Sequence, residues 1–349
     1  MSKEYAYKYN NGVLVFGYED NAYKPYKYYE LRRKFERLYG KQELPEIEIY
    51  TTTPYIDLET HEVIKTIGYH EKYKLLMMQD FSDLNLEPYE NLEEVKQAID
   101  FLNSFIDFVY PTNQEAQNEL LAHLICSCSG ASLFRRPPII VSRDCSPHFC
   151  DIDVAHAVGG ALYGVHTGEI PIIFFYRGGR LFIELKHALT DHKIAFLITS
   201  ENVRGAIRFL SSCIYRDIYY VNFGRRARIS KRQNKSLIVL TAPDYVSIRN
   251  PGRCFTHFQI KQVNEEKIKN YEYFYIDEEE VNYIDYIRYI LKQRKKIIEA
   301  GVRLVLWWLK DKDSYKVNLP YDSNNEHLYL VRDVLCLSNR PFGTSKNLI

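Results

Sequence analysis

The residues with the clearest chemical potential lie at 137–164, where an apolar run is followed by a polar turn and an amphipathic segment. This order predicts a strand, a tight turn and a helix, the arrangement with which proteins hold phosphate at a helix N-terminus. The phosphate-binding pattern G-x-x-x-x-G-K-[ST] has four fixed positions, occupied here by Ser142, Pro147, His148 and Phe149. The segment therefore has the surroundings of a nucleotide-binding turn without the residue types that such a turn uses.

The replacements at these positions each remove one contact with a nucleotide. Glycine lets successive backbone N–H groups face phosphate oxygens, whereas Pro147 has no N–H and has a fixed φ. His148 is mostly neutral at pH 7, so it does not supply the charge of the usual lysine. Phe149 has no oxygen with which to bind Mg²⁺. We therefore expect neither ATP nor magnesium as a cofactor at this turn.

Zinc is the second chemistry that this turn suggests, because Cys145, His148 and Cys150 are zinc-ligand types and Cys126 and Cys128 lie upstream. The spacing C-x-x-H-x-C matches no common zinc module, however, and the seven cysteines of the chain are irregularly spaced. We expect these residues to fill a collapsed turn without a metal.

A third chemistry is metal-dependent nuclease activity, which uses an acidic residue followed by an E-x-K pattern. Asp151 and Asp153 precede Glu184 and Lys186 in that order. The pattern is short and matches by chance are common, so it remains an alternative only.

Composition narrows the class of protein. The chain has 349 residues, enough for two or three domains, and its hydrophobic (46%) and charged (26%) contents are typical of a soluble globular protein. The net charge of +1 excludes a global field that attracts nucleic acid or membrane.

The N-terminal residues are too polar for a signal peptide and the apolar runs too short for a bilayer, which predicts an intracellular, cytoplasmic protein without a membrane partner. The 30 Tyr against three Met suggest a biased genome, such as that of a thermophilic archaeon or its mobile elements.

The patterns along the chain predict three domains. Residues 1–90 alternate in short apolar runs and predict a β-rich α+β leader, with one helix at 28–38. Residues 91–265 begin with a helical pair at 91–109 and 112–128 and continue as apolar strands separated by helices, which predicts an α/β core with a mainly parallel sheet. Residues 266–349 predict a helical region, with a helix at 277–309 that Gly301 interrupts and a mobile tail. The expected core strands are 138–141, 171–176, 194–199, 236–241 and 255–261.

A basic segment at 225–235 stands out in a chain of almost zero net charge. Six of its eleven residues are cationic, and the strands expected at 218–223 and 227–230 place it on a hairpin. Cations on a hairpin bind phosphates without reading sequence. We expect DNA to bind here, and the alternative is a solvated loop; the cations are Arg225, Arg226, Arg228, Lys231, Arg232 and Lys235.

The order of these elements resembles the AAA+ ATPase modules of the viral and plasmid superfamily 3 or primase-helicase type, over roughly residues 90–300. The strand and turn at 138–149 are similar to Walker A, and the strand at 194–199 followed by Ser200-Glu201-Asn202 is similar to Walker B. The strand at 236–241 resembles sensor 1, and 250–253 resembles the segment of a ring arginine, here Arg253. In that family the hairpin between Walker B and sensor 1 contacts the DNA backbone in a central channel.

The resemblance implies a degenerate module. Ser200 stands where Walker B has its Mg²⁺-binding Asp, and only Glu201 remains to activate water. Losses in two motifs predict a protein that does not hydrolyse ATP. Arg253 then serves an active partner subunit, or is a surface arginine after a Pro-Gly turn. Trp307 and Trp308 are either an interface anchor or a pair with one side in the core and the other half-exposed.

The function that we expect is a non-hydrolysing, helicase-like role in the replication or maintenance of a viral or plasmid genome. The protein would bind DNA or an active AAA+ partner and assemble as a ring. An active helicase or metal-dependent nuclease is one alternative, and an interaction protein that antagonises host defence without nucleic acid is another.

Overall fold

The computed structural model describes slightly under half of the chain: residues 3–9, 12–19, 21–25, 37–39, 42–57, 59–109, 121, 124–125, 128, 139–143, 172–174, 195–199, 218–223, 226–231, 237–243, 256–260, 274–276, 279–281 and 283–311. Side chains are described mainly at 4–106 and 285–310. Within these residues, no helix combines the length and the apolar character that crossing a membrane requires.

The N-terminal residues form three small sheets, as the alternating pattern predicts. Strands β1 (Lys3–Tyr9), β2 (Gly12–Glu19) and β3 (Ala22–Pro25) make an antiparallel sheet. Strand β8 (Leu75–Met77) lies between β4 (Ile49–Thr51), which is parallel to it, and β7 (Gly68–His70), which is antiparallel. Strands β5 (Tyr55–Ile56) and β6 (Val63–Ile64) form a hairpin.

Three details of this leader differ from the sequence prediction. The run at 63–69 is two strands, β6 and β7, because a bend separates them. The run at 72–78 begins as the 3-10 helix η1 (Glu71–Tyr73), which ends at Lys74 in a left-handed conformation with φ 45°. Of the helix expected at 28–38, residues 37–39 are helical and 28–36 lie outside the described residues.

An aromatic face holds the first two sheets together. The register of β1, β2 and β3 puts Tyr5, Tyr7, Phe16 and Tyr23 on one face. Tyr7 and Phe16 are buried against Leu76 and Met78 of the second sheet region, and the Tyr7 and Phe16 rings meet edge to face with centroids 5.9 Å apart. The leader therefore has a hydrophobic core of its own, built largely from tyrosine.

The parallel sheet expected from the apolar runs is present, with five strands that are all parallel. Its strand order is β10-β11-β14-β9-β15. All five strands fall within two residues of the predicted positions; they are β9 (Ile139–Arg143), β10 (Ile172–Phe174), β11 (Ala195–Thr199), β14 (Leu237–Pro243) and β15 (Thr256–Ile260). The helices expected at 152–162, 180–189 and 203–215 lie outside the described residues.

Helix α2 (Leu92–Val109) confirms the first helix of the predicted pair. Asn91 caps it, because its Oδ1 accepts the backbone N–H of Glu94 at 3.0 Å while its Nδ2 donates to the Glu94 carboxylate. In the second helix, Leu121, Leu124, Ile125 and Cys128 are helical and buried.

Helix α8 (Tyr283–Asp311) corrects the prediction for the C-terminal region. The helix begins at 283 rather than 277, and the residues before it include the antiparallel strands β16 (Phe274–Ile276) and β17 (Glu279–Val281). It also runs without a break through Gly301. A Cβ atom at Gly301 would lie 2.7 Å from the Cβ of Cys128 and closer still to its Sγ. Glycine is therefore used for close helix packing and not as a break.

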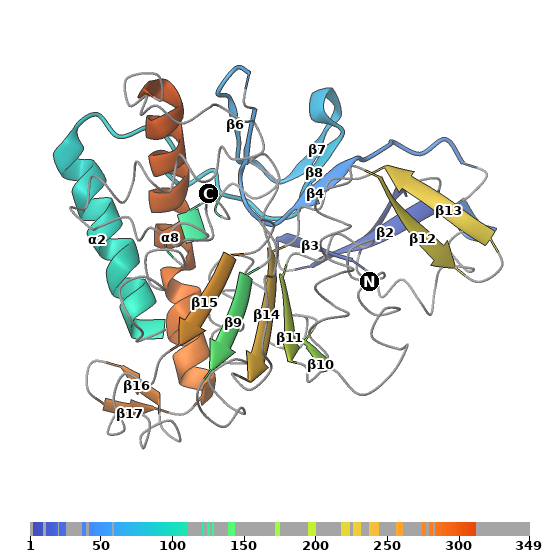
Figure 1. Ribbon diagram of the computed structural model, residues 1–349. Helices are drawn as coiled ribbons and strands as arrows, with labels where there is room; N and C mark the ends of the chain where they lie inside the picture. Colours follow the sequence, from blue (N-terminus) through green and yellow to red (C-terminus); the bar gives the residue numbers. More distant parts are fainter. Residues whose placement is uncertain are drawn as a thin grey trace.

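Helix α8 packs on the N-terminal part of the chain, beside α2 (Figure 1). The buried Arg294 donates to the backbone oxygen of Thr52, and Arg303 donates to that of Glu87 at 2.8 Å. Trp307 and Trp308 are also buried, so neither is the half-exposed residue or interface anchor considered from the sequence. The three-domain division remains a prediction, but the last predicted domain contacts both of the others through this helix.

Candidate functional site

The candidate site is the edge of the parallel sheet at which β9 and β14 end. These strands are neighbours, and the chain leaves them in opposite directions: from β9 toward β10 at one edge, and from β14 toward β15 at the other. Open parallel sheets bind ligands outside the carboxyl ends of their strands, where the strand order reverses in this way. The sheet therefore places its expected binding position directly after Arg143 and Pro243.

The register brings the sequence-predicted motifs to this edge. Thr199 of β11 is level with Thr241 of β14, which is level with Val141 of β9. The segments that follow β9 and β11 thus start at the same edge with one strand between them, about 10 Å apart. A phosphate-holding turn and a Walker B-like carboxylate have to meet in this manner if both contact one nucleotide.

The structure describes few of the predicted residues of this site. Ser142 lies in β9 opposite Ala242 of β14 and Gln259 of β15. The remaining candidates lie outside the described residues, and their roles stay predictions; they are Cys145, Pro147, His148, Phe149, Cys150, Glu201 and Arg253.

The described part of the basic segment lies on a two-stranded hairpin, as predicted. Strands β12 (Ile218–Phe223) and β13 (Arg226–Lys231) are antiparallel, and Phe223 pairs with Arg226. Arg226, Arg228 and Lys231 are on β13, whereas Arg225, Arg232 and Lys235 lie outside the described residues. In Figure 1 the hairpin lies at the edge of the molecule opposite α2, beyond the end of the parallel sheet.

One of the cysteines considered for a zinc site, Cys128, lies where the second helix packs against α8. The thiol of Cys128 is fully buried, 3.2 Å from the backbone oxygen of Leu124 and 3.5 Å from that of Ile297. It packs against Gly301 of α8. Over the described part of the chain, no group of three or more His, Cys, Asp or Glu side chains is placed to hold a metal ion.

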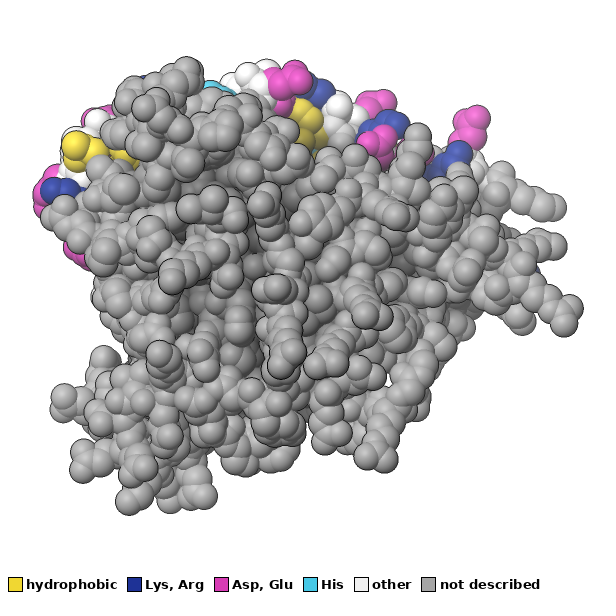
Figure 2. All heavy atoms as spheres, viewed as in Figure 1, with side chains coloured by type: hydrophobic (Ala, Val, Ile, Leu, Met, Phe, Trp, Pro, Cys, Tyr) yellow, Lys and Arg dark blue, Asp and Glu magenta, His cyan; other side chains and the backbone are white. Residues whose placement is uncertain are grey.

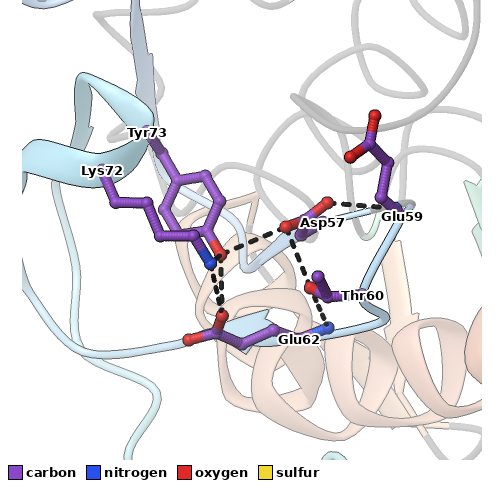
Figure 3. Close-up of polar contacts among 6 residues, drawn as sticks. All are labelled: Asp57, Glu59, Thr60, Glu62, Lys72 and Tyr73. Atoms are coloured by element: carbon purple, nitrogen blue, oxygen red, sulfur yellow. Dashed lines mark hydrogen bonds and ion pairs between the residues drawn. The ribbon is translucent and has the colours of Figure 1, made fainter.

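Sequence reasoning did not anticipate a polar network in the leader (Figure 3). The Tyr73 hydroxyl lies 3.2 Å from a carboxylate oxygen of Asp57 and 2.7 Å from one of Glu62, and Lys72 donates to the same Glu62 oxygen at 3.1 Å. Asp57 also accepts from the backbone N–H of Glu59 and the hydroxyl of Thr60. The only sequence signal was the polar turn at 59–62.

The electrostatics of this network indicate a structural tie. The N–H of Glu59, with the Thr60 hydroxyl, holds the pKa of the Asp57 carboxyl below its usual value. Hydrogen bonds from Tyr73 and Lys72 do the same for the pKa of Glu62. Carboxylates held ionised are poor proton acceptors. The network therefore fixes the β5–β6 hairpin to η1 rather than forming a catalytic pair.

The described surface of the leader and of α8 mixes both charges. Figure 2 shows acidic and basic side chains interspersed along the upper rim, with no area of one sign. Several belong to ion pairs, such as Lys74 with Glu46 and Glu48 at 3.0 and 2.9 Å. On the face drawn in Figure 2, the described side chains thus form no area of a single charge.

Comparisons with known proteins give a distant likeness in structure only. No family model matches the chain, and no curated protein matches it. An apo structure (form A) of the NrS-1 C-terminal region is similar with a TM-score of 0.44 and 9% identity, over 95% of this chain and 71% of that one. A second apo structure of this region gives a TM-score of 0.41 and 10% identity, over 94% of this chain and 70% of that one.

Proposed function

We propose that this chain is a non-hydrolysing, AAA+-like protein that binds nucleic acid through the hairpin β12–β13, in the replication or maintenance of a viral or plasmid genome. The proposal includes assembly with copies of itself or with an active AAA+ subunit. It rests on two features: the strand order of the parallel sheet and the place of the basic hairpin in that order.

The parallel sheet supports the AAA+-like part of the proposal. The strand that leads into the Walker A-like turn (β9) and the Walker B-like strand (β11) flank the sensor-1-like strand (β14), and all three are parallel. A sheet built in sequence order would separate β9 from β14 by the two strands between them. This chain instead inserts β14 beside β9, which creates the reversal point at which nucleotides bind.

The hairpin is the observation that carries the nucleic-acid part. It is formed from residues between β11 and β14, so it lies in the chain where the resembled helicases have their DNA-contacting hairpin. Six cations in the eleven residues of 225–235 supply a local positive field in a chain of net charge +1. Such a field binds phosphates with little dependence on sequence.

The absence of hydrolysis follows from residue types. The turn lacks the residue types that contact Mg-ATP, since it has Pro147, His148 and Phe149 at these positions. In the Walker B-like segment, Ser200 replaces the Mg²⁺-binding Asp. The former nucleotide position at the edge of the sheet then has a structural role only, and nucleic acid binds at the hairpin.

Two titrations test the proposal. For nucleic acid, Arg226→Ala with Arg228→Ala should weaken binding to a labelled oligonucleotide by about tenfold or more and reduce the slope of log K against log salt by roughly two. An unchanged affinity and an unchanged slope would contradict the role of the hairpin.

For nucleotide, a fluorescent ATP analogue with Mg²⁺ should not bind the wild-type chain, and His148→Lys serves as a probe of any remaining shape of the turn. Tight binding or phosphate release by the wild type would contradict the non-hydrolysing part of the proposal. It would favour an active ATP-dependent helicase.

A further inference from the structure

The C-terminal half of helix α8 has the burial of a central core element. Over residues 300–309, every residue is buried except Arg303, which is partly exposed. A helix on the surface of a protein buries one face only, whereas a helix that is buried on all sides lies at the centre of a core. The residues that surround α8 therefore show which parts of the chain share this core.

Part of these surroundings comes from the segment that leads from the leader into α2. The guanidinium of Arg294 lies 5.1 Å from the centre of the buried Phe81 ring. About 13 Å further along the helix axis, Arg303 lies 4.0 Å from the centre of the buried Tyr89 ring. Two separate points of α8 thus hold this segment.

The two helices that precede the parallel sheet pack on α8 as well. Helix α2 lies beside it (Figure 1), and the buried thiol of Cys128 in the second helix reaches Gly301 and the backbone oxygen of Ile297. Among the described elements, no comparable backbone packing joins the parallel sheet to α8, α2 or a leader strand. Helix α8 follows the sheet in the sequence, yet it packs mainly on elements that precede the sheet.

From these contacts we infer that α8 is a clasp, which joins the leader, the two helices before the sheet and α8 itself into one cooperative unit that opens separately from the parallel sheet. The unit is discontinuous in sequence, because the sheet strands at 139–260 lie between its two parts. Cooperative units of a protein open as wholes, each at a free energy of its own. The inference concerns the opening of the fold and does not depend on the ligand proposed for the hairpin.

Native-state hydrogen exchange of the full chain at low urea concentrations tests the clasp. Peptides that cover β8, α2 and α8 should approach one exchange rate with one dependence on urea, because a single opening exposes all three. Peptides that cover β11 and β14 should follow a different dependence. A single dependence for all five elements would mean that the chain opens only as a whole, which would overturn the inference.

Reciprocal substitutions on the two sides of the clasp sharpen this test. Arg303→Ala, on α8, should accelerate exchange in β8 by about tenfold or more, because it removes the contacts with Tyr89 and with the segment before α2. Phe81→Leu, on the other side, should accelerate exchange in α8 by about fivefold. Both should change exchange in β11 and β14 by less than about twofold.

The matched control is Arg288→Ala, which removes an exposed arginine from the same helix and should change exchange in β8 by less than about twofold. Acceleration confined to the element that carries the substitution would contradict the clasp, since the leader and α8 would then open independently. Equal acceleration in β11 and β14 would also contradict it. Phe81→Leu is conservative, so its effect on α8 remains measurable even if Arg303→Ala does not fold.

Discussion

The leader with helix α8 and the parallel sheet use their polar residues in different ways. In the leader, charged side chains are tied to the backbone or to each other: Arg294 to the oxygen of Thr52, Arg303 to that of Glu87, and Tyr73 to Asp57. In the parallel sheet, the apolar strands β9, β11 and β14 are each followed by segments that begin at one edge. The contrast indicates that the leader and α8 form a scaffold, and it agrees with our proposal that ligand binding belongs to the sheet and its hairpin.

The largest effect expected on the scaffold comes from Gly301. Helix propensity alone favours alanine over glycine by about 1 kcal/mol. Against this, a Cβ atom would overlap the Cys128 side chain, and overpacking of a core costs about 1–3 kcal/mol. We expect Gly301→Leu to lower the free energy of unfolding by about 3 kcal/mol, measured by denaturant unfolding with circular dichroism.

A second substitution tests whether the contact with Cys128 is the reason that position 301 requires glycine. Cys128→Ala removes the Sγ atom that lies nearest to position 301, so the double variant Cys128→Ala/Gly301→Ala should lose less than the sum of the two single losses. If the losses are additive, the close approach of the two helices is not what requires glycine.

Arg303 is expected to have the next largest effect. Its guanidinium lies 4.0 Å from the centre of the Tyr89 ring, donates to the oxygen of Glu87, and is 3.8 Å from the Glu94 carboxylate. Loss of the stacking and of the charged hydrogen bond should cost about 2 kcal/mol in Arg303→Ala. Arg303→Lys keeps the charge without the planar donors and should cost about 1 kcal/mol.

The matched control is Arg288→Ala on the same helix. Arg288 is exposed and forms a local pair with Asp285 at 3.0 Å, so its removal should change the free energy of unfolding by less than about 0.5 kcal/mol. Equal effects at Arg288 and Arg303 would mean that α8 is not anchored through Arg303.

The polar network at Tyr73 should give a smaller, pH-dependent effect. The pKa values of Asp57 and Glu62 are lowered in the folded state, so their stabilisation is present above the unfolded pKa and is lost as pH falls through the folded pKa. Tyr73→Phe removes one hydroxyl contact to each carboxylate. It should therefore unfold more readily at neutral pH and converge with the wild type at acid pH.

Acid unfolding followed by near-ultraviolet circular dichroism measures this difference. A gap between Tyr73→Phe and wild type that stays constant from pH 7 to below the folded pKa values would show that the hydroxyl does not act through the carboxylates.

Local patterns predicted much of the fold, because they depend on neighbouring residues. Runs of β-branched and apolar residues placed the five core strands within two residues, and the apolar face of residues 91–109 predicted α2. The segment from residue 277 was assigned to the C-terminal helix because it is charged and amphipathic, but Glu279 and Glu280 belong to strand β17. The ends of an amphipathic pattern are a weak signal for the exact boundary of a helix.

The remaining features depend on residues far apart in the chain. The donor of the Arg294–Thr52 hydrogen bond is 242 positions from its acceptor, and the need for glycine at 301 comes from Cys128. Neither of these two contacts produces a pattern among neighbouring residues of the sequence. The strand order, and with it the edge that forms the candidate site, also follows from pairing between distant segments. The basic hairpin could be predicted because its cations and both strands lie within about 20 consecutive residues.

The smallest effect on stability is expected at the two arginines of β13, which we propose to bind nucleic acid. In Arg226→Ala/Arg228→Ala, thermal unfolding should stay within about 0.5 kcal/mol of the wild type while nucleic-acid binding falls. A residue kept for ligand binding has no folding contact to lose, in contrast to Arg303 and Gly301. If the double variant is destabilised as strongly as Arg303→Ala, the arginines of β13 hold the protein together, and the hairpin belongs with the scaffold rather than with the binding surface.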